Sequence, residues 1–184
     1  SISKKVSAKT VLNPRSSPIF IELDLAIPNE ASNDQYILYH NSNSGVGYAA
    51  FTRATTSNSK ADLTFTIFSG STTASVTAEV EKGSFAHVCL SYDNSIQEKR
   101  AKILSGSVVV ATSDRVSFDS INTAGSPLLI GSGSALAISS FTPTQTFSGS
   151  INNFRVYHKT RSASEIDRYV KRTLFADSNS GNVL

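Results

Sequence analysis

The chain has 184 residues, of which 39% are hydrophobic and 17% are charged, and its formal net charge is +3. A chain of this length forms one domain with a sizeable core, and its composition excludes intrinsic disorder. It contains no apolar run long enough to cross a bilayer, and its basic residues lack the interleaved aromatics of a nucleic-acid-binding surface. Because it begins Ser-Ile-Ser and contains no methionine, we expect a mature or excised piece of a longer polypeptide.

Short segments rich in β-branched and aromatic residues predict β-strands along most of the chain. Residues 1–18 are polar and contain two prolines, so we expect an arm or an edge strand there. Residues 19–27 place isoleucine or leucine at every second position, which predicts a half-buried strand. Further strands are predicted at residues 36–40, 48–52, 63–68, 74–80, 85–92, 101–104, 108–111 and 127–131. The run at 85–92 is the most apolar and is expected at the centre of a sheet, whereas 136–145 is assigned to a polar loop.

The last strand and the one predicted helix lie within residues 147–174. The strand contains Ile151, Phe154, Val156 and Tyr157. Ser162 followed by Glu165 is a capping box, in which each side chain accepts a hydrogen bond from a backbone N–H at the start of a helix. The apolar face of that helix is predicted at Ile166, Tyr169, Val170 and Leu174. We expect the basic residues of this region to be solvated, and these are Lys159, Arg161, Arg168, Lys171 and Arg172.

About eleven short strands with regular turns predict an antiparallel sandwich or jelly roll. The single cysteine, Cys89, excludes an internal disulfide framework. It lies between Val88 and Leu90, so we expect a buried and inert thiol.

Three stretches carry a resemblance to a known family. They read PIFIELDLAIP, then GSFAHVCLSYD with ILSGSVVVAT, then PLLIGSG with FSGSINNFRVYHKTRSASEI. In this order they resemble the concanavalin A-like lectin/glucanase superfamily, and within it the laminin-G-like (pentraxin-like) jelly-roll domains. The resemblance implies an all-β fold, an antiparallel β-sandwich with one short C-terminal helix, over residues 19–175. Residues 176–184 are then expected to form a tail or linker.

Glu22 and Asp24 are the candidate catalytic pair. They are two residues apart on a predicted strand, so both side chains lie on one face. Family-16 glycoside hydrolases of this fold carry a strand E-x-D-x-(x)-E, whose carboxylates act as nucleophile and acid. Here Ala26 and Ile27 replace the third carboxylate, and the chain has no tryptophan on which sugars would stack. A solvated strand face is therefore favoured over catalysis.

The resemblance also implies calcium, which relatives bind through carboxylates and backbone carbonyls at loop ends. Where the family has acidic residues, this chain has Asn152 and Asn153, and neutral amides weaken calcium binding. Asp34, Asp93 and Asp119 are further candidate ligands in loops, with turn formation as the alternative for each. A structural calcium ion held by these aspartates and Asn152 is one hypothesis for this chain.

Tyrosines and amides around the turn at 41–45 form the candidate sugar-binding surface. They are Tyr36, Tyr39, Asn41, Asn43 and Tyr48. Amides donate to sugar hydroxyls and rings stack on sugars, but we favour packing on strand faces for each tyrosine. His40, His87 and His158 are isolated, with no metal-ligand spacing. His87 matches a framework position of the family, which implies a hydrogen-bonding role.

The favoured function is a non-catalytic binding module of a larger surface-exposed protein, recognising carbohydrate or glycoprotein. The alternative is a structural or assembly domain of a virion, phage tail or other multi-subunit surface, whose partners are copies of itself or neighbouring domains. A glycanase ranks last. Each function implies an extracellular, cell-surface or virion-surface location, with no nucleic-acid partner and no membrane insertion.

Overall fold

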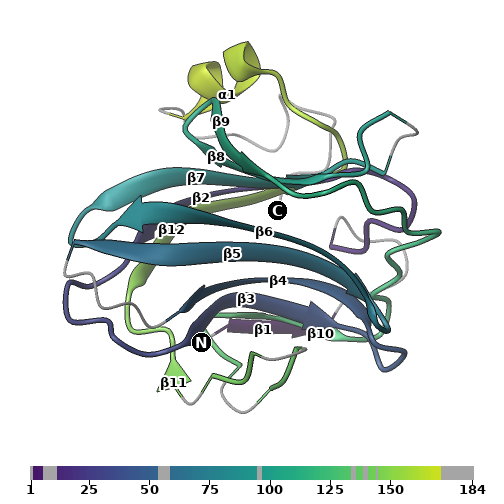
Figure 1. Ribbon diagram of the computed structural model, residues 1–184, viewed down its shortest axis with the longest axis horizontal. Helices are drawn as coiled ribbons and strands as arrows, with labels where there is room; N and C mark the ends of the chain where they lie inside the picture. Colours follow the sequence, from purple (N-terminus) through teal and green to yellow (C-terminus); the bar gives the residue numbers. More distant parts are fainter. Residues whose placement is uncertain are drawn as a thin grey trace.

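Two β-sheets stack on each other in the computed structural model, which describes residues 2–5, 12–53, 59–94, 97–133, 136–138, 141–143 and 145–170 (Figure 1). The elements are β1 (Ile2–Lys5), β2 (Ile19–Ala26), β3 (Gln35–Asn41), β4 (Val46–Arg53), β5 (Lys60–Ser69), β6 (Thr72–Glu81), β7 (Phe85–Tyr92), β8 (Ala101–Ser105), β9 (Val108–Thr112), β10 (Pro127–Ile130), β11 (Gln145–Thr146), β12 (Ser150–Tyr157) and α1 (Ala163–Tyr169).

The larger sheet has the strand order β1-β10-β3-β4-β5-β6, with β11 beside β3, and the smaller sheet has the order β12-β2-β7-β8-β9. Neighbouring strands are antiparallel except β11, which pairs parallel with β3. The antiparallel β-sandwich is thus confirmed, and the described residues contain one short helix, near the C-terminus, as predicted. The prediction of a central strand at 85–92 is also confirmed, because β7 is the middle strand of the smaller sheet.

Two short strands, β1 and β11, refine the sequence predictions for the larger sheet. Residues 2–5 form β1, an edge strand of the larger sheet. Gln145, the last residue of the predicted loop at 136–145, forms β11 together with Thr146, because their backbone pairs with Gln35 and Tyr36 of β3. The predicted tail at 176–184, together with Leu174, Lys171 and Arg172, lies outside the described residues.

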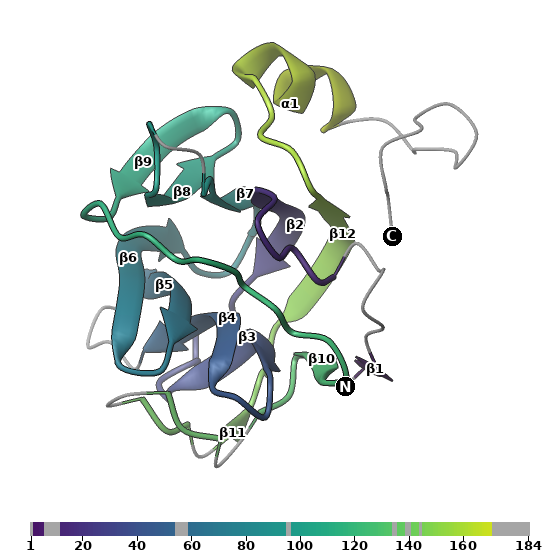
Figure 2. The ribbon, with the colours of Figure 1, turned by 90° about the vertical axis from the view of Figure 1, so that its right-hand side faces the viewer.

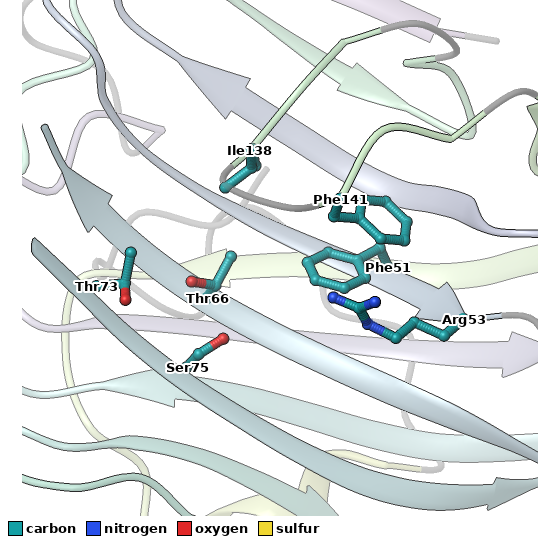
Figure 3. Close-up of a pocket in the computed structure, with 7 residues that line it drawn as sticks. All are labelled: Phe51, Arg53, Thr66, Thr73, Ser75, Ile138 and Phe141. Carbon is teal, nitrogen blue, oxygen red and sulfur yellow. The ribbon is translucent and has the colours of Figure 1, made fainter. Parts of the chain in front are cut away.

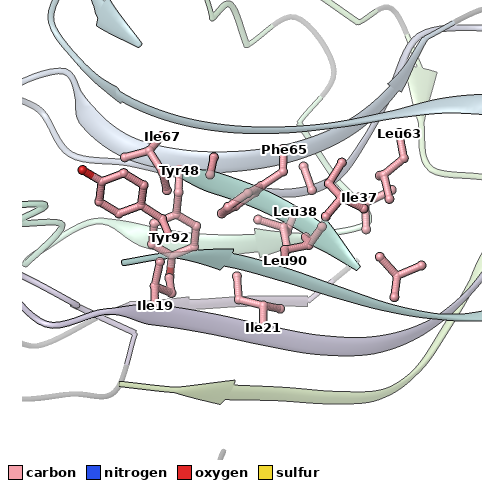
Figure 4. Packing of buried hydrophobic residues seen from close by; sticks show 14 of the residues in the cluster. Ile19, Ile21, Ile37, Leu38, Tyr48, Leu63, Phe65, Ile67, Leu90 and Tyr92 are labelled. Carbon is pink, nitrogen blue, oxygen red and sulfur yellow. The ribbon is translucent and has the colours of Figure 1, made fainter. Parts of the chain in front are cut away.

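The core fills the space between the inner faces of the two sheets. In Figure 4, Ile21 and Leu90 of the smaller sheet lie across from Leu38 and Phe65 of the larger sheet, and each is at most 1% exposed. This arrangement follows from the two-residue period of a strand, which sends every second side chain to the same face. Burying each such leucine or isoleucine stabilises the fold by about 1.5–3 kcal/mol.

Helix α1 covers part of the outer face of the smaller sheet (Figure 2). The predicted capping box is confirmed, because Ser162 Oγ accepts a hydrogen bond from Glu165 N and Glu165 Oε2 accepts one from Ser162 N. Ile166 is 1% exposed and packs with Phe20 and Cys89 on that face. Strand β2 is therefore largely buried on both faces, which corrects the prediction of a half-buried strand at 19–27.

His40 and Tyr48 form a buried polar contact. Neither side chain has exposed surface, and His40 Nδ1 lies 3.0 Å from Tyr48 Oη. The Tyr48 hydroxyl donates to the Leu12 carbonyl at 3.0 Å, so the imidazole donates from Nδ1. Burial disfavours the charged imidazolium and lowers the pKa of His40 from 6.5 to about 4.

The free energy of unfolding should therefore fall as the pH drops from 6.5 to about 4. In this range the imidazole of residue 40 binds a proton in the unfolded chain but stays neutral in the folded protein. The loss attributable to this group amounts to about 3 kcal/mol at the acid end. His40→Asn retains a donor toward Tyr48 but does not titrate, so its stability should decline less. Urea unfolding of both proteins across this pH range measures the difference, and parallel pH profiles would contradict the prediction.

Candidate functional site

A buried ionic cluster lies beneath α1 on the outer face of the smaller sheet. Glu22 of β2 is the negative group, and its side chain is 1% exposed. Arg155 Nη1 lies 3.5 Å from Glu22 Oε2, and Arg161 Nε lies 3.5 Å from Glu22 Oε1. The guanidinium of Arg161 also lies over the ring of Tyr157, 4.3 Å from its centroid. The predictions of solvated positions for Glu22 and Arg161 were wrong, because α1 and its connection cover this face.

Asp24, His87 and Cys89 form a chain of contacts beside this cluster. His87 Nδ1 is 2.8 Å from Asp24 Oδ1, and His87 Nε2 is 3.6 Å from Cys89 Sγ. Asn153, at a β-bulge of β12, donates its amide to Asp24 Oδ2. The order carboxylate, imidazole and thiol is that of a nucleophilic relay.

The thiol of Cys89 does not suit that chemistry. It has no exposed surface, and burial together with the nearby Glu22 carboxylate raises its pKa well above the ordinary value. The reactive form of cysteine is the thiolate, whereas this neutral thiol donates to the Gly106 carbonyl at 3.6 Å. The prediction of a buried thiol is confirmed, and His87 has the hydrogen-bonding role implied by the resemblance.

The sequence analysis did not predict that Asp24, His87 and Cys89 lie in contact beside Glu22. His87 and Cys89 are two residues apart on β7, as Glu22 and Asp24 are on β2, so each pair shares a strand face. The register then sets Asp24 opposite His87 and Glu22 opposite Cys89. The shared spacing was visible in the sequence, but the register was not.

The four predicted calcium ligands do not form one site. Asp93 follows Tyr92, which pairs with Ile19 at the start of β2, whereas Asn152 pairs with Asp24 near the end of β2. Asp119 lies at the same end of the sandwich as Asp93. Asn94, which follows Asp93, donates a hydrogen bond to the carbonyl of Phe118, which precedes Asp119. Asp34 lies in the loop that follows β2. The described part of the chain contains no group of three His, Cys, Asp or Glu side chains arranged for a metal ion.

The predicted sugar-binding tyrosines are packing residues in this structure. Tyr48 lies in the core between the sheets with no exposed surface, and Tyr36 and Tyr39 are 1% and 8% exposed. Asn41 donates its amide to the Tyr39 hydroxyl at 3.0 Å. Asn43 is exposed in the turn that follows β3. The three tyrosine rings therefore pack against other residues, as the sequence analysis favoured, rather than forming a sugar-binding surface. A ligand at Asn41 or Asn43 stays a prediction.

A groove of about 150 Å³ opens on the outer face of the larger sheet (Figure 3). It is lined by Phe51, Arg53, Thr66, Thr73, Ser75, Ile138 and Phe141. The strand residues come from β4, β5 and β6, at alternate positions that face away from the core. Ile138 and Phe141, which pair with each other, come from the segment between β10 and β11.

Stacked aromatic rings and a guanidinium form one wall of this groove. The rings of Phe51 and Phe141 are stacked with centroids 3.8 Å apart. The guanidinium carbon of Arg53 lies 5.7 Å and 5.4 Å from these two centroids, within cation–π range. Sequence reasoning did not select any of these residues. The available signal was that hydroxyl side chains occupy alternate positions of β5 and β6, a pattern typical of the outer face of a sheet; of those that line the groove, Thr73 and Ser75 are exposed and Thr66 is buried.

The observation that decides the family is a match over most of the chain. A family model described as the concanavalin A-like lectin/glucanases superfamily matches residues 17–167. The chain belongs to this superfamily. The matched range spans the smaller sheet, most of the larger sheet and the first turn of α1, so the resemblance inferred from the sequence motifs is confirmed.

Solved structures share the fold of this superfamily member at low sequence identity. A heptameric SAP-like pentraxin from Limulus polyphemus has 16% identity and a TM-score of 0.59, covering 89% of this chain and 78% of the pentraxin. Domains LG4-5 of the mouse laminin alpha1 chain have 14% identity and a TM-score of 0.56, covering 84% of this chain. The chain spans 37% of that laminin fragment. No curated protein matches the chain.

The superfamily fold leaves two outer sheet faces that differ in chemistry. The smaller sheet buries Glu22 with two arginines under α1, whereas the larger sheet presents hydroxyls and a guanidinium in an open groove. Because the groove is open and combines polar with apolar residues, it is the candidate ligand site.

Among the described residues, no helix is long and apolar enough to cross a membrane.

Glu22→Gln removes the negative charge that faces both buried guanidinium groups, and we expect a loss of about 3–5 kcal/mol in the free energy of unfolding. Glu79→Gln is the matched control, because Glu79 forms an exposed ion pair with Lys60 at 3.0 Å and should change stability very little. Urea unfolding at neutral pH measures both variants. Equal effects of the two substitutions would contradict a special role for the buried carboxylate.

Proposed function

We propose that this chain is a non-catalytic binding module that recognises carbohydrate or glycoprotein, with the groove on the larger sheet as its binding site. The groove is the observation that carries the proposal. Binding sites for small ligands combine apolar walls with a few well-placed polar groups. The groove has this composition, because Phe141 and Ile138 provide an apolar wall and Thr66, Ser75 and Arg53 provide polar groups. Membership of a superfamily named for its lectins supports the same function.

The positions of Glu22 and Asp24 support the non-catalytic part of the proposal. A glycosidase needs two carboxyl groups that flank the scissile bond of a bound sugar. Glu22 is buried and faces two guanidinium groups beneath α1. Asp24 is engaged by His87 and Asn153. In this arrangement the pair stabilises the fold, and we place the module on an extracellular or otherwise exposed surface.

A glycan array with the purified protein tests the binding function. We expect binding to a restricted set of glycans that is abolished by Ser75→Tyr, since a bulky ring on exposed β6 would fill the groove. Thr112→Tyr, at an exposed position of β9 in the other sheet, adds the same ring elsewhere and should bind as the wild type does. The proposal fails if no glycan binds, or if both variants retain full binding.

A second candidate function is assembly with copies of the same chain, and the edge strand β9 favours it. Val108, Val109 and Val110 are 65%, 49% and 50% exposed, and Phe85 on the same sheet is 59% exposed. Edge strands usually carry charged residues or proline that prevent pairing, whereas β9 reads VVVAT. Two copies of β9 could pair about a two-fold axis and join the smaller sheets.

Size-exclusion chromatography with light scattering over increasing protein concentration tests this assembly. We expect a concentration-dependent dimer that Val109→Lys converts to a monomer, because a charge on the edge strand opposes pairing. Thr77→Lys adds the same charge to β6, the edge of the larger sheet, and should leave the dimer intact. A wild-type protein that stays monomeric at every concentration would exclude β9-mediated assembly.

A further inference from the structure

We propose that the groove selects sugars that carry an anionic substituent, a carboxylate or a sulfate, and that Arg53 is the residue that selects them. This inference rests on the proposed function of the groove and adds the chemical class of its ligand. A guanidinium presents N–H donors in a planar fork that matches the oxygen atoms of a carboxylate or sulfate.

The guanidinium of Arg53 is held in place by the aromatic wall. It lies within cation–π distance of both Phe51 and Phe141, whose rings are stacked and at most 4% exposed. A guanidinium that lies over a ring still directs its N–H groups outward in its own plane. Figure 3 shows it beside the ring of Phe51, on the side from which Thr66 and Ser75 line the groove. Little side-chain entropy is then lost when an anion binds.

The positive charge of Arg53 is not neutralised by a neighbouring carboxylate in the described part of the chain. Asp62 is its register partner on β5, and Glu79 is the next residue across on β6. Neither comes within ion-pair distance of Arg53, and Glu79 instead pairs with Lys60 at 3.0 Å. The side chain of Arg53 therefore lies at the groove rather than against Asp62 or Glu79, and an anionic ligand in the groove would complete its hydrogen bonding.

Hydroxyl groups on the other side of the groove distinguish a sugar from a simple anion. Thr66, Thr73 and Ser75 line it, and none of the three forms a side-chain hydrogen bond to another residue among the described ones. Each hydroxyl can donate and accept, as the hydroxyls of a sugar do. The volume of about 150 Å³ lies below the roughly 300 Å³ at which pockets for drug-sized ligands begin. The groove is therefore too small for several sugar units, and we assign it one substituted sugar unit of a glycan.

Isothermal titration with three matched oligosaccharides tests the inference: one ending in glucuronate, its neutral glucose counterpart, and a sulfated form of that glucose counterpart. We expect the wild type to bind the two acidic probes roughly tenfold or more tightly than the neutral one, as charge-assisted hydrogen bonds predict. Arg53→Gln should remove this preference and leave the weak neutral binding unchanged. Arg53→Lys keeps the charge without the fork and should retain part of the preference.

Two further variants separate a local contact from the overall charge. Arg168→Gln removes one positive charge from an exposed position of α1, on the other sheet, and should bind all probes as the wild type does. Asp62→Asn removes a negative charge beside Arg53 and should tighten binding of the acidic probes. Thermal unfolding of each variant establishes that it is folded.

The outcomes separate this inference from the proposed function. Equal wild-type affinity for acidic and neutral probes would overturn the inference and leave glycan binding standing. Equal losses in Arg53→Gln and Arg168→Gln would overturn it as well, since they would indicate a general charge effect. Full displacement of the acidic probes by equimolar inorganic sulfate would indicate a simple anion site and overturn the choice of a sugar. Failure of every probe and of the glycan array would overturn both proposals.

Discussion

The carboxylate of Glu22 is buried in the middle of the smaller sheet, and the C-terminal part of the fold is arranged around it. An isolated carboxylate in an apolar environment is strongly destabilising, so it must be paired or hydrogen-bonded. Arg155 reaches it from the adjacent strand β12, and Arg161 reaches it from the connection between β12 and α1. The path from β12 to α1 therefore depends on the charge at position 22. Replacing the whole cluster by apolar residues need not destabilise the domain, but removing one member leaves an unbalanced charge.

This pairing has a consequence for where a ligand can bind. With Arg161 and Ile166 packed against β2, the outer face of the smaller sheet is covered over the carboxylate cluster. The outer face of the larger sheet carries no helix in the described part of the chain, and Ile138 and Phe141 line the groove on it. One side of the sandwich thus serves stability and the other remains open to a partner. A single fold can in this way support many binding functions, since the ligand site lies outside the core.

The strands were predictable because their signal is local and repeated. Alternation along 19–27 fixes which side chains share a face, and the capping box at Ser162 and Glu165 fixes the start of α1 without help from distant residues. The prediction of a solvated Glu22 failed for the opposite reason. The residues that cover it lie more than a hundred positions away in sequence, and neither strand alternation nor composition indicates which face a helix will cover.

The amino-acid sequence by itself determined the fold class, the order and limits of most strands, the capped helix and the superfamily. These features depend on periodicity, turn residues and short motifs, all of which act over a few residues. Only the tertiary structure decided that Asp24, His87 and Cys89 touch, that the tyrosines at 36 and 48 are packing residues, and that Arg53 meets Phe141 beside a row of hydroxyls. Those contacts depend on strand register and on how segments far apart in the chain cover each face, and a side chain acquires its function from that environment.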